Sequence, residues 1–268
     1  MAPMQDRRME GKVAIITGAG SRAEGIGNGR ASSVLLARHG TKVALVDENP
    51  DWAMRTQEMI EAEGGVSHVV PGDVTIPADC ARIVREAVRL WGRLDVLVNN
   101  VGIAGPPGTA VDVDLDAWDR ALRVNVTSMM LMAKFAIPEM ERNGGAIINI
   151  ASYAGLFGGH PSLLYPTSKG AVVNMTRAMA AHHAPQGIRV NAVAPGMVYT
   201  PMVYAGGMSE ETRAARRNRS LLKTEGSGWD VGNAVLYLAS EEARWVTGIV
   251  LPVDAGASAA PSAYPARR

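Results

Sequence analysis

The 268-residue chain has a single cysteine, Cys80, and only two phenylalanines. One cysteine excludes an internal disulfide and a metal cluster built from several thiolates, so we expect a reducing, cytoplasmic setting. Excess charge is also missing, because 27 lysine and arginine residues face 26 aspartates and glutamates. This balance gives no reason to expect nucleic acid or an anionic membrane as a partner.

Long apolar runs are absent too. The polar start from Met1 to Lys12 is followed by no apolar segment of signal-peptide length, and no later run approaches the ~18 apolar residues of a membrane span. We therefore expect no targeting signal and no membrane segment. The length and the 47% hydrophobic content suit one α/β domain, which we predict over residues 1–256, with a tail over 257–268.

Short β-branched segments alternate with longer helical patterns along the whole chain. This alternation is typical of a parallel sheet that is covered by helices on both faces. The predicted strands are residues 13–17, 42–46, 67–72, 94–98, 146–150, 188–193 and 249–253.

The first predicted strand leads directly into a glycine-rich loop. Glycines between a strand and a helix let backbone amides approach a pyrophosphate without clashes. Gly18, Gly20 and Ala23 match the short G-x-G-x-x-A form, whereas Gly25 and Gly27 describe a loop with about three extra residues. We favour the longer loop because helical periodicity resumes only near its end. A merely flexible connection is the alternative, but the position after the first strand favours phosphate binding.

Asp47 ends the second predicted strand, about 20 residues beyond the glycines. A carboxylate there can accept hydrogen bonds from an adenosine ribose, and it repels a 2′-phosphate, so it predicts NAD rather than NADP. Arg22 in the loop argues the other way, because it can pair with a 2′-phosphate. We give Asp47 more weight, since an arginine in a long loop can face solvent. Its structural alternative is a turn-forming aspartate.

Ser152, Tyr165 and Lys169 form the most informative group. If Tyr165 opens a helix, Lys169 lies one turn later on the same face, beside the phenol ring. A free tyrosine titrates near ~10, and a cation at ~4 Å supplies about the 4 kcal/mol needed for a phenolate at neutral pH. The pair therefore predicts an acid/base centre, although Tyr-x-x-x-Lys alone is also found on ordinary helix surfaces.

An ordered set of such motifs runs from Lys12 to about Gly256, and together the set resembles the short-chain dehydrogenase/reductase family. The resemblance implies a Rossmann-type, doubly wound, seven-stranded parallel sheet. It also implies an oxidoreductase that transfers a hydride reversibly between NAD(H) and a secondary alcohol or ketone. The motifs are Thr17-Gly18, Gly25-Ile26-Gly27, Asp73-Val74, Asn99-Asn100-Val101-Gly102, Asn125, Ser152, Tyr165-x-x-x-Lys169, Pro195-Gly196 and Val253-Asp254-Ala255-Gly256.

The resemblance also implies roles for single residues. Tyr165 would be the general acid/base, Lys169 would lower its pKa and hold the nicotinamide ribose, and Ser152 would bind the reacting oxygen. Asn125 would anchor a water that relays protons to Lys169, unless it only satisfies backbone groups at a helix kink. No metal site is implied. The further implied cofactor contacts are Gly18, Ser21, Gly25, Ile26, Gly27, Asp47, Asp73, Val74, Asn99, Val101, Gly102, Pro195, Gly196, Val198 and Thr200.

Asp73 has a second reading, as a cap for the helix that starts near Pro77. Residues 197–228 are weakly patterned, as in a mobile lid. The arginines of this segment, Arg213, Arg216, Arg217 and Arg219, are either a solvated helix face or a site that meets an anionic substrate. The predicted pocket wall, which suits cyclic or aromatic alcohols, is Ile103, Ala104, Leu156, Phe157, Met197, Met202 and Tyr204.

Two other functions share many of these features. One is an NADPH-dependent 3-oxoacyl-thioester ketoreductase, which Asp47 disfavours. The other is a non-catalytic protein that only binds the dinucleotide, which the complete catalytic set disfavours. The resemblance further implies a homotetramer that is assembled through the helices after Asn125 and at Tyr165.

Overall fold

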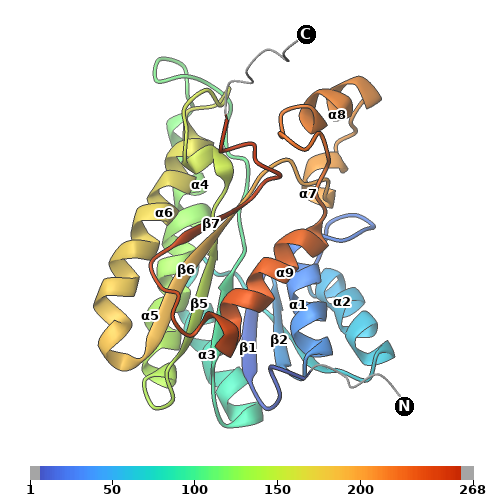
Figure 1. Ribbon diagram of the computed structural model, residues 1–268. Coiled ribbons are helices and arrows are strands. Elements are labelled where there is room, and N and C mark those ends of the chain that lie inside the picture. Colours follow the sequence, from blue (N-terminus) through green and yellow to red (C-terminus); the bar gives the residue numbers. More distant parts are fainter. Residues whose placement is uncertain (1–6, 261–268) are drawn as a thin grey trace.

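The computed structural model describes residues 7–260. Seven strands form one parallel sheet in the order β3-β2-β1-β4-β5-β6-β7 (Figure 1). This is the doubly wound order of Rossmann-type sheets, so the predicted fold class is confirmed. The strands are β1 Val13–Thr17, β2 Lys42–Asp47, β3 Val66–Pro71, β4 Val96–Asn99, β5 Gly145–Ile150, β6 Ile188–Pro195 and β7 Val250–Val253.

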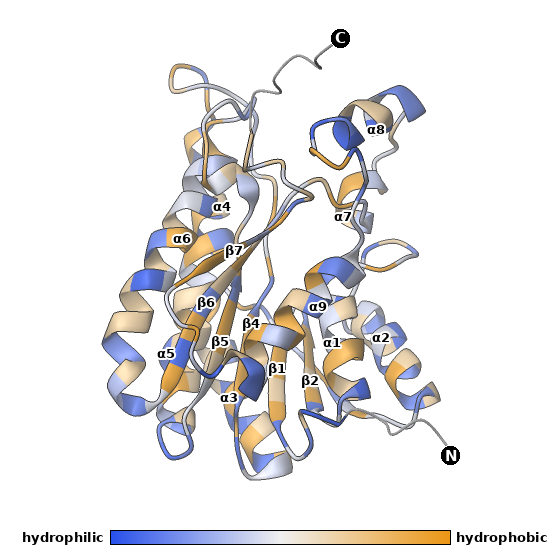
Figure 2. Cartoon of the chain, viewed as in Figure 1, coloured by the Kyte–Doolittle hydropathy of each residue, from blue (hydrophilic) through white to orange (hydrophobic). Residues whose placement is uncertain are grey.

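The central strands are buried on both faces, which explains their continuous apolar composition. All five residues of β1 are buried, and Ile15 lies in register with Ala44 of β2 and Leu97 of β4. Figure 2 shows the strands as mainly hydrophobic, whereas helix α8 is strongly hydrophilic. A strand with no solvent-facing side has no reason to alternate polar and apolar residues, so only its length and β-branched content identify it.

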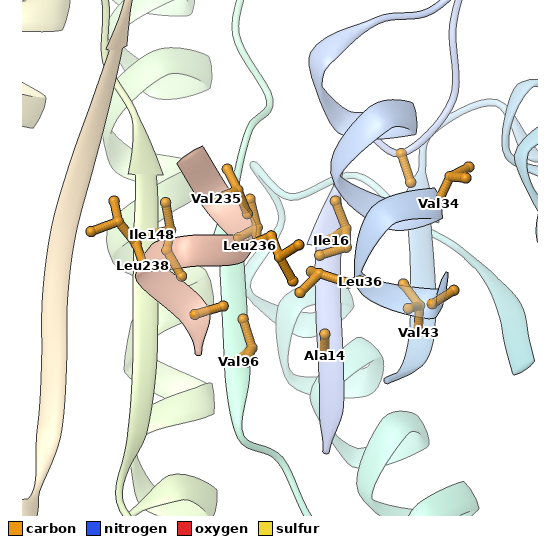
Figure 3. Packing of buried hydrophobic residues seen from close by; sticks show 14 of the residues in the cluster. Ala14, Ile16, Val34, Leu36, Val43, Val96, Ile148, Val235, Leu236 and Leu238 are labelled. Atoms are coloured by element: carbon orange, nitrogen blue, oxygen red, sulfur yellow. The ribbon is translucent and has the colours of Figure 1, made fainter. Parts of the chain in front are cut away.

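Helices cover the sheet in two layers. On one face α1, α2 and α9 pack against the strands, and on the other face α3, α5 and α6 do so. Figure 3 shows the first layer, in which side chains of α1 and α9 lie over β1, β2, β4 and β5. The helices are α1 Asn28–Arg38, α2 Pro50–Ala62, α3 Pro77–Trp91, α4 Leu115–Leu122, α5 Ser128–Met140, α6 Leu164–His183, α7 Pro201–Tyr204, α8 Glu210–Arg217 and α9 Gly228–Ala239.

The strand order reverses between β1 and β4, and this reversal creates a crevice at the carboxyl edge of the sheet. The glycine loop leaves β1 at this edge, and Ser152 follows β5 there. Helices α7 and α8 project beyond the same edge, and the loop after β1 reaches toward α7 (Figure 1). The predicted lid segment therefore contains two short helices above the crevice.

Three details differ from the sequence expectations. Helix α1 begins at Asn28, two residues later than the periodicity indicated. A five-residue π-helical segment, Arg123–Thr127, joins α4 to α5 where a helix kink was one reading. The predicted tail 257–268 lies outside the described residues from 261 onward, while Ala257 donates a backbone hydrogen bond to Asp254. Within residues 7–260 no helix is long and apolar enough to cross a bilayer.

Candidate active site

A cavity of about 760 Å³ lies at the carboxyl edge, between the strand ends and the α7–α8 segment. It collects loops that follow six different strands, as expected at a topological switch point. The predicted site residues that line it are Gly18, Ser21, Gly27, Asp47, Asp73, Val74, Val101, Gly102, Ser152, Tyr165, Lys169, Pro195, Gly196, Val198 and Thr200. Four predicted residues do not line it, namely Gly25, Ile26, Asn99 and Asn125.

Tyr165 and Lys169 lie one turn apart at the start of α6, with both side chains directed inward. The Lys169 side chain is almost fully buried, and its Nζ lies 5.9 Å from the centre of the Tyr165 ring. The same Nζ donates a 2.9 Å hydrogen bond to the carbonyl of Ile150, at the end of β5. Burial disfavours the ammonium form and lowers the pKa of Lys169 to about 8.

The Tyr165 hydroxyl behaves differently from the sequence expectation. Burial raises the pKa of Tyr165, while a hydrogen bond with Ser152 and the charge of Arg216 oppose this rise. Lys169 Nζ lies 5.9 Å from the ring centre and donates to the Ile150 carbonyl, so the lowering of the Tyr165 pKa by Lys169 stays a prediction.

Ser152 is fixed by its own backbone neighbourhood. Its Oγ accepts a 3.2 Å hydrogen bond from the amide of Ala154, which starts a single 3-10 turn over Tyr153–Gly155. This turn holds the hydroxyl at the end of β5 and leaves its proton available toward Tyr165. Ser152 and Tyr165 therefore form a hydroxyl pair that can bind one substrate oxygen.

Asn125 lies in the π-helical segment, behind the cavity wall rather than in it. Its Oδ1 accepts from the amide of Ile103 at 2.8 Å, and its Nδ2 donates to the Ile103 carbonyl at 2.9 Å and to Ser168 at 3.0 Å. A Cβ on Gly102 would lie 3.3 Å from Lys169 Nζ and 3.4 Å from Asn125 Oδ1. The asparagine thus fixes the loop next to Lys169, while its water relay stays a prediction.

The sequence favoured Gly25 and Gly27 as the glycines of the phosphate-binding loop. In the structure Gly27 and Gly29 line the cavity, whereas Gly25 does not. A Cβ on Gly29, in the first turn of α1, would lie 2.0 Å from the carbonyl oxygen of Gly18. Helix and strand can approach this closely only because Gly29 has no side chain. Gly25 instead lies away from the cavity, where its carbonyl accepts a 2.6 Å hydrogen bond from the buried Arg30.

We expect Gly29→Ala to weaken dinucleotide binding by at least about 10-fold and to destabilise the protein by roughly 1–3 kcal/mol, because the new methyl group meets backbone. Titration of NADH fluorescence and urea unfolding measure the two effects. Gly158→Ala is the matched control, since nothing lies within 4 Å of a Cβ at that position. Equal behaviour of the two variants would contradict the assignment of Gly29.

The start of α1 suits a diphosphate. Its N-cap, Gly27, makes no side-chain capping hydrogen bond, and Gly27, Asn28 and Gly29 all line the cavity. Free amides at a helix N-terminus attract anions, so the residues present fit the pyrophosphate of a dinucleotide.

Asp47 lies at the tip of β2, where it faces the same cavity. Its Oδ2 accepts a 2.9 Å hydrogen bond from the Gly20 amide, and its Oδ1 accepts from the Asn49 amide at 3.1 Å. Burial raises the pKa of this carboxyl, and these two hydrogen bonds oppose the rise. Arg22 is exposed and also lines the cavity. Asp47 and Arg22, the two residues that argue for NAD and for NADP, therefore both border it.

Two strand-end residues behave unlike their sequence readings. Asp73 does not cap α3, whose N-cap is Ile76; its Oδ1 accepts from Thr75 in the cavity wall. Asn99 points into the core, where its Nδ2 donates to Asn149 at 2.9 Å. Its neighbour Asn100 lines the cavity instead and donates to the carbonyls of Thr17 and Gly18. Successive side chains of a strand point to opposite faces, so only one residue of an Asn pair can face the cavity. The sequence alone does not show which one it is.

The lid contacts the glycine loop directly. The Tyr204 hydroxyl of α7 donates a 2.7 Å hydrogen bond to the carbonyl of Glu24, and its ring lies 4.6 Å from that of Tyr199. Arg213 of α8 lies 3.8 Å above the Tyr199 ring and pairs with Glu225 at 2.7 Å.

Of the predicted pocket wall, Ile103, Ala104, Met197 and Met202 line the cavity, whereas Leu156, Phe157 and Tyr204 do not. Across residues 7–260 no cluster of three or more His, Cys, Asp or Glu is placed to hold a metal ion.

Known proteins share both the sequence and the architecture. The enoyl-(acyl carrier protein) reductase family model matches residues 20–258. The 2-(S)-hydroxypropyl-CoM dehydrogenase 3 of Xanthobacter autotrophicus is 40% identical over 94% of this chain and 98% of its own. A protein from Burkholderia xenovorans, assigned to the short-chain dehydrogenases/reductases, has a TM-score of 0.90 and 41% identity over 94% of this chain and 98% of its own.

A third similar protein was solved with ligands. It is a 7α-hydroxysteroid dehydrogenase in complex with NADH and 7-oxo glycochenodeoxycholic acid. Its TM-score is 0.87, with 32% identity over 96% of this chain and 98% of its own. Identity at this level over nearly the full length of both chains supports a common family and not only a common fold.

Proposed function

The chain belongs to the short-chain dehydrogenase/reductase family, and from that premise we propose that it transfers a hydride reversibly between NAD(H) and a secondary alcohol or its ketone. The observation that carries the proposal is the inward-facing group of Ser152, Tyr165 and Lys169 in one cavity with an uncapped helix start. The two named dehydrogenases act on a hydroxypropyl group and on a steroid, and a secondary alcohol is what these substrates share.

Ser152 and Tyr165 bind the reacting oxygen between their hydroxyls. In oxidation the Tyr165 phenolate accepts the hydroxyl proton of the alcohol, and in reduction the phenol returns a proton to the developing alkoxide. Since burial raises the pKa of Tyr165, oxidation speeds up as the pH rises and reduction is favoured at lower pH. Lys169, 5.9 Å from the centre of the phenol ring, and Arg216, whose charge acts on Tyr165, would supply positive charge near this proton transfer.

When bound, the nicotinamide dinucleotide accepts the hydride in oxidation and donates it in reduction. Gly18 and the Gly27–Gly29 turn would hold its pyrophosphate, and Asp47 would accept from the adenosine ribose. Lys169 would hold the nicotinamide ribose. Pro195 to Thr200 would enclose the nicotinamide ring.

The first experiment is a panel of secondary alcohols and diols, with NADH formation followed by absorbance. We expect turnover of at least one aliphatic, cyclic or aromatic secondary alcohol. A complete lack of turnover across the panel and across the matching ketones, with dinucleotide binding intact, would instead support the non-catalytic binding protein.

For the cofactor we expect kcat/KM with NAD to exceed that with NADP by about 100-fold, because a buried carboxylate repels a 2′-phosphate. Asp47→Asn keeps the hydrogen-bond geometry but removes the charge, so it should reduce this preference by about 10-fold. Arg22→Gln is the companion variant. A wild-type preference for NADP that Arg22→Gln abolishes would show that Arg22 governs the choice.

The ketoreductase alternative has one specific support, the description of the matching family model as an acyl carrier protein reductase. Such an enzyme would share Ser152, Tyr165 and Lys169, and it would use NADPH. Asp47 argues against that cofactor. Reduction of an acetoacetyl thioester with NADPH, faster than any ketone with NADH, would establish the alternative.

Domain extent, assembly and location are part of the same proposal. We infer one catalytic domain over residues 1–256, since the cavity draws on elements from β1 to β6 and the lid. We also infer a homotetramer assembled through α5 and α6, supported by the exposed Met130 of α5. A cytoplasmic location is inferred from the single cysteine, Cys80, which cannot form an internal disulfide. Light scattering of the purified protein tests the assembly.

A further inference from the structure

Arg216 is the residue of the α8 cluster that turns into the cavity. Its Nη2 donates a 3.2 Å hydrogen bond to the carbonyl of Val198, in the strand-end segment below the lid. Its Nε is buried and has no partner among the described residues. A guanidinium presents five N–H donors in a fixed fork, so an unused buried donor is a strong sign of a missing acceptor.

The nearest carboxylate does not fill this role. Glu225 is engaged through Oε2 with both Nε and Nη2 of Arg213, at 2.9 and 2.7 Å. Arg216 feels its charge but makes no ion pair with it. Arg213 is therefore paired with Glu225 and stacked on Tyr199. The other Glu225 oxygen, Oε1, is buried without a partner within residues 7–260 and acts on Arg216 through its charge, while Arg216 itself lines the cavity.

Charge is divided unevenly along the cavity. The carboxylates that line it are Asp47, Glu48 and Asp73, all at the ends of β2 and β3, where the adenosine would lie. Arg219 also lines the cavity, and burial together with the like charge of Arg219 lowers the pKa of Arg216. Two arginines together, with no carboxylate in the adjoining wall, are an arrangement that a bound anion stabilises.

Arg216 also lies close to the chemistry. It lines the same cavity as Tyr153 and Tyr165, and its charge acts on both. A substrate held at Tyr165 therefore shares the cavity with Arg216.

We propose that Arg216, assisted by Arg219, forms an anion subsite, so that the substrate is a secondary alcohol or ketone with an anionic group at its far end. The inference rests on the proposed function of the same cavity. Carboxylate, sulfonate and phosphate share the planar or tripod oxygens that a guanidinium binds with two parallel hydrogen bonds. The lid would then close on the anion and position the carbonyl between Ser152 and Tyr165.

The test compares levulinate with its neutral ethyl ester as ketone substrates, with NADH consumption as the readout. A charge-assisted hydrogen bond contributes ~1.5–3 kcal/mol, so kcat/KM for the anion should exceed that for the ester by about 10- to 100-fold. Arg216→Gln should remove this preference, because levulinate should lose about 10-fold or more beyond any loss that the ester suffers from the missing charge near Tyr165, and Arg216→Lys should restore part of it. Arg217→Gln is the matched control, because Arg217 is exposed on the same helix and does not line the cavity.

Binding without turnover supplies the second readout. Calorimetric titration of the NAD-bound protein with butyrate, butanesulfonate and butyl phosphate should show at least one saturable anion, which Arg216→Gln weakens by about 10-fold. The three arms decide which anion the subsite prefers. If anions bind in this way but no carbonyl compound is reduced, the proposed function fails and the subsite stands.

Three results would overturn the subsite. The first is equal kcat/KM for levulinate and its ester in the wild type. The second is an equal loss for both substrates in Arg216→Gln, which would show a structural role for the arginine. The third is a rise in the KM for NADH alone, which would assign Arg216 to the cofactor.

Discussion

Tyr165→Phe is expected to lower kcat by about 1000-fold or more while NADH still binds within about 3-fold of the wild-type affinity. Loss of a general acid/base costs roughly 100- to 10,000-fold, and here the same change also removes one of the two hydroxyls that bind the reacting oxygen. The phenylalanine fills the buried ring position, so the fold is kept. Steady-state turnover and NADH fluorescence titration separate the two quantities.

The control for this experiment is Tyr237→Phe, which deletes the same atom on the exposed side of α9. Its kcat should stay within about 2-fold of the wild-type value, as expected for a surface substitution. Near-normal turnover by Tyr165→Phe would remove the phenol from the mechanism. A parallel loss of NADH binding would instead make the tyrosine a cofactor contact.

Lys169→Met is expected to change activity and stability in opposite directions. Activity should fall by about 100-fold, because the variant lacks the ammonium that lies beside Tyr165 and that we propose to hold the nicotinamide ribose. The pKa of Lys169 is about 8 in the folded protein and 10.5 when unperturbed, a difference worth about 3 kcal/mol against folding at neutral pH. Leaving the Ile150 carbonyl without its donor costs about 1 kcal/mol, so the free energy of unfolding should rise by roughly 2 kcal/mol.

The pH dependence of this gain has a definite sign. The unfolded chain binds the Lys169 proton more tightly than the folded protein does, so the penalty is complete below about pH 8 and disappears as the pH rises toward 10.5. Urea unfolding of both proteins at about pH 7 and about pH 9.5 measures the difference. Lys134→Met, on the exposed side of α5, should differ from the wild type by less than about 0.5 kcal/mol at either pH. A destabilised Lys169→Met protein at neutral pH would contradict the burial argument.

The fold was readable from the sequence because its strands are buried on both faces. Runs such as Val13–Thr17 and Val96–Asn99 have no solvent-facing residues, and the turns between them carry glycine, proline or aspartate at helix ends. Alternation of these runs with amphipathic helices leaves few arrangements besides a doubly wound sheet. The residue order along the chain also placed Asp47 and Ser152 at one edge, since the carboxyl ends of parallel strands lie together.

The features that the sequence did not predict depend on how closely segments far apart in the chain approach each other in the folded protein. Gly29 matters because its missing Cβ lets α1 meet the carbonyl of Gly18, and no local pattern reports that distance. Asn99 and Asn100 are chemically identical, and only the direction of each side chain separates a core amide from a cavity amide. The predicted placement of Lys169 beside the Tyr165 ring agrees with the structure, whereas the hydrogen bond of Nζ to the Ile150 carbonyl depends on a contact between α6 and β5 that no local pattern reports. The arginine cluster was ambiguous until Glu225 was seen to pair with Arg213 and not with Arg216.

The hydrogen bond from Tyr204 to the Glu24 carbonyl has a mechanical consequence. The long loop after β1 holds the dinucleotide side of the crevice, while α7 belongs to the segment that covers the substrate side. An outward movement of α7 would break this bond. The same loop is held at Gly25, whose carbonyl accepts a hydrogen bond from Arg30 of α1, and Arg30 also donates to Thr56 of α2. We therefore expect an opening of α7 that releases product to loosen the loop beside the predicted dinucleotide site as well.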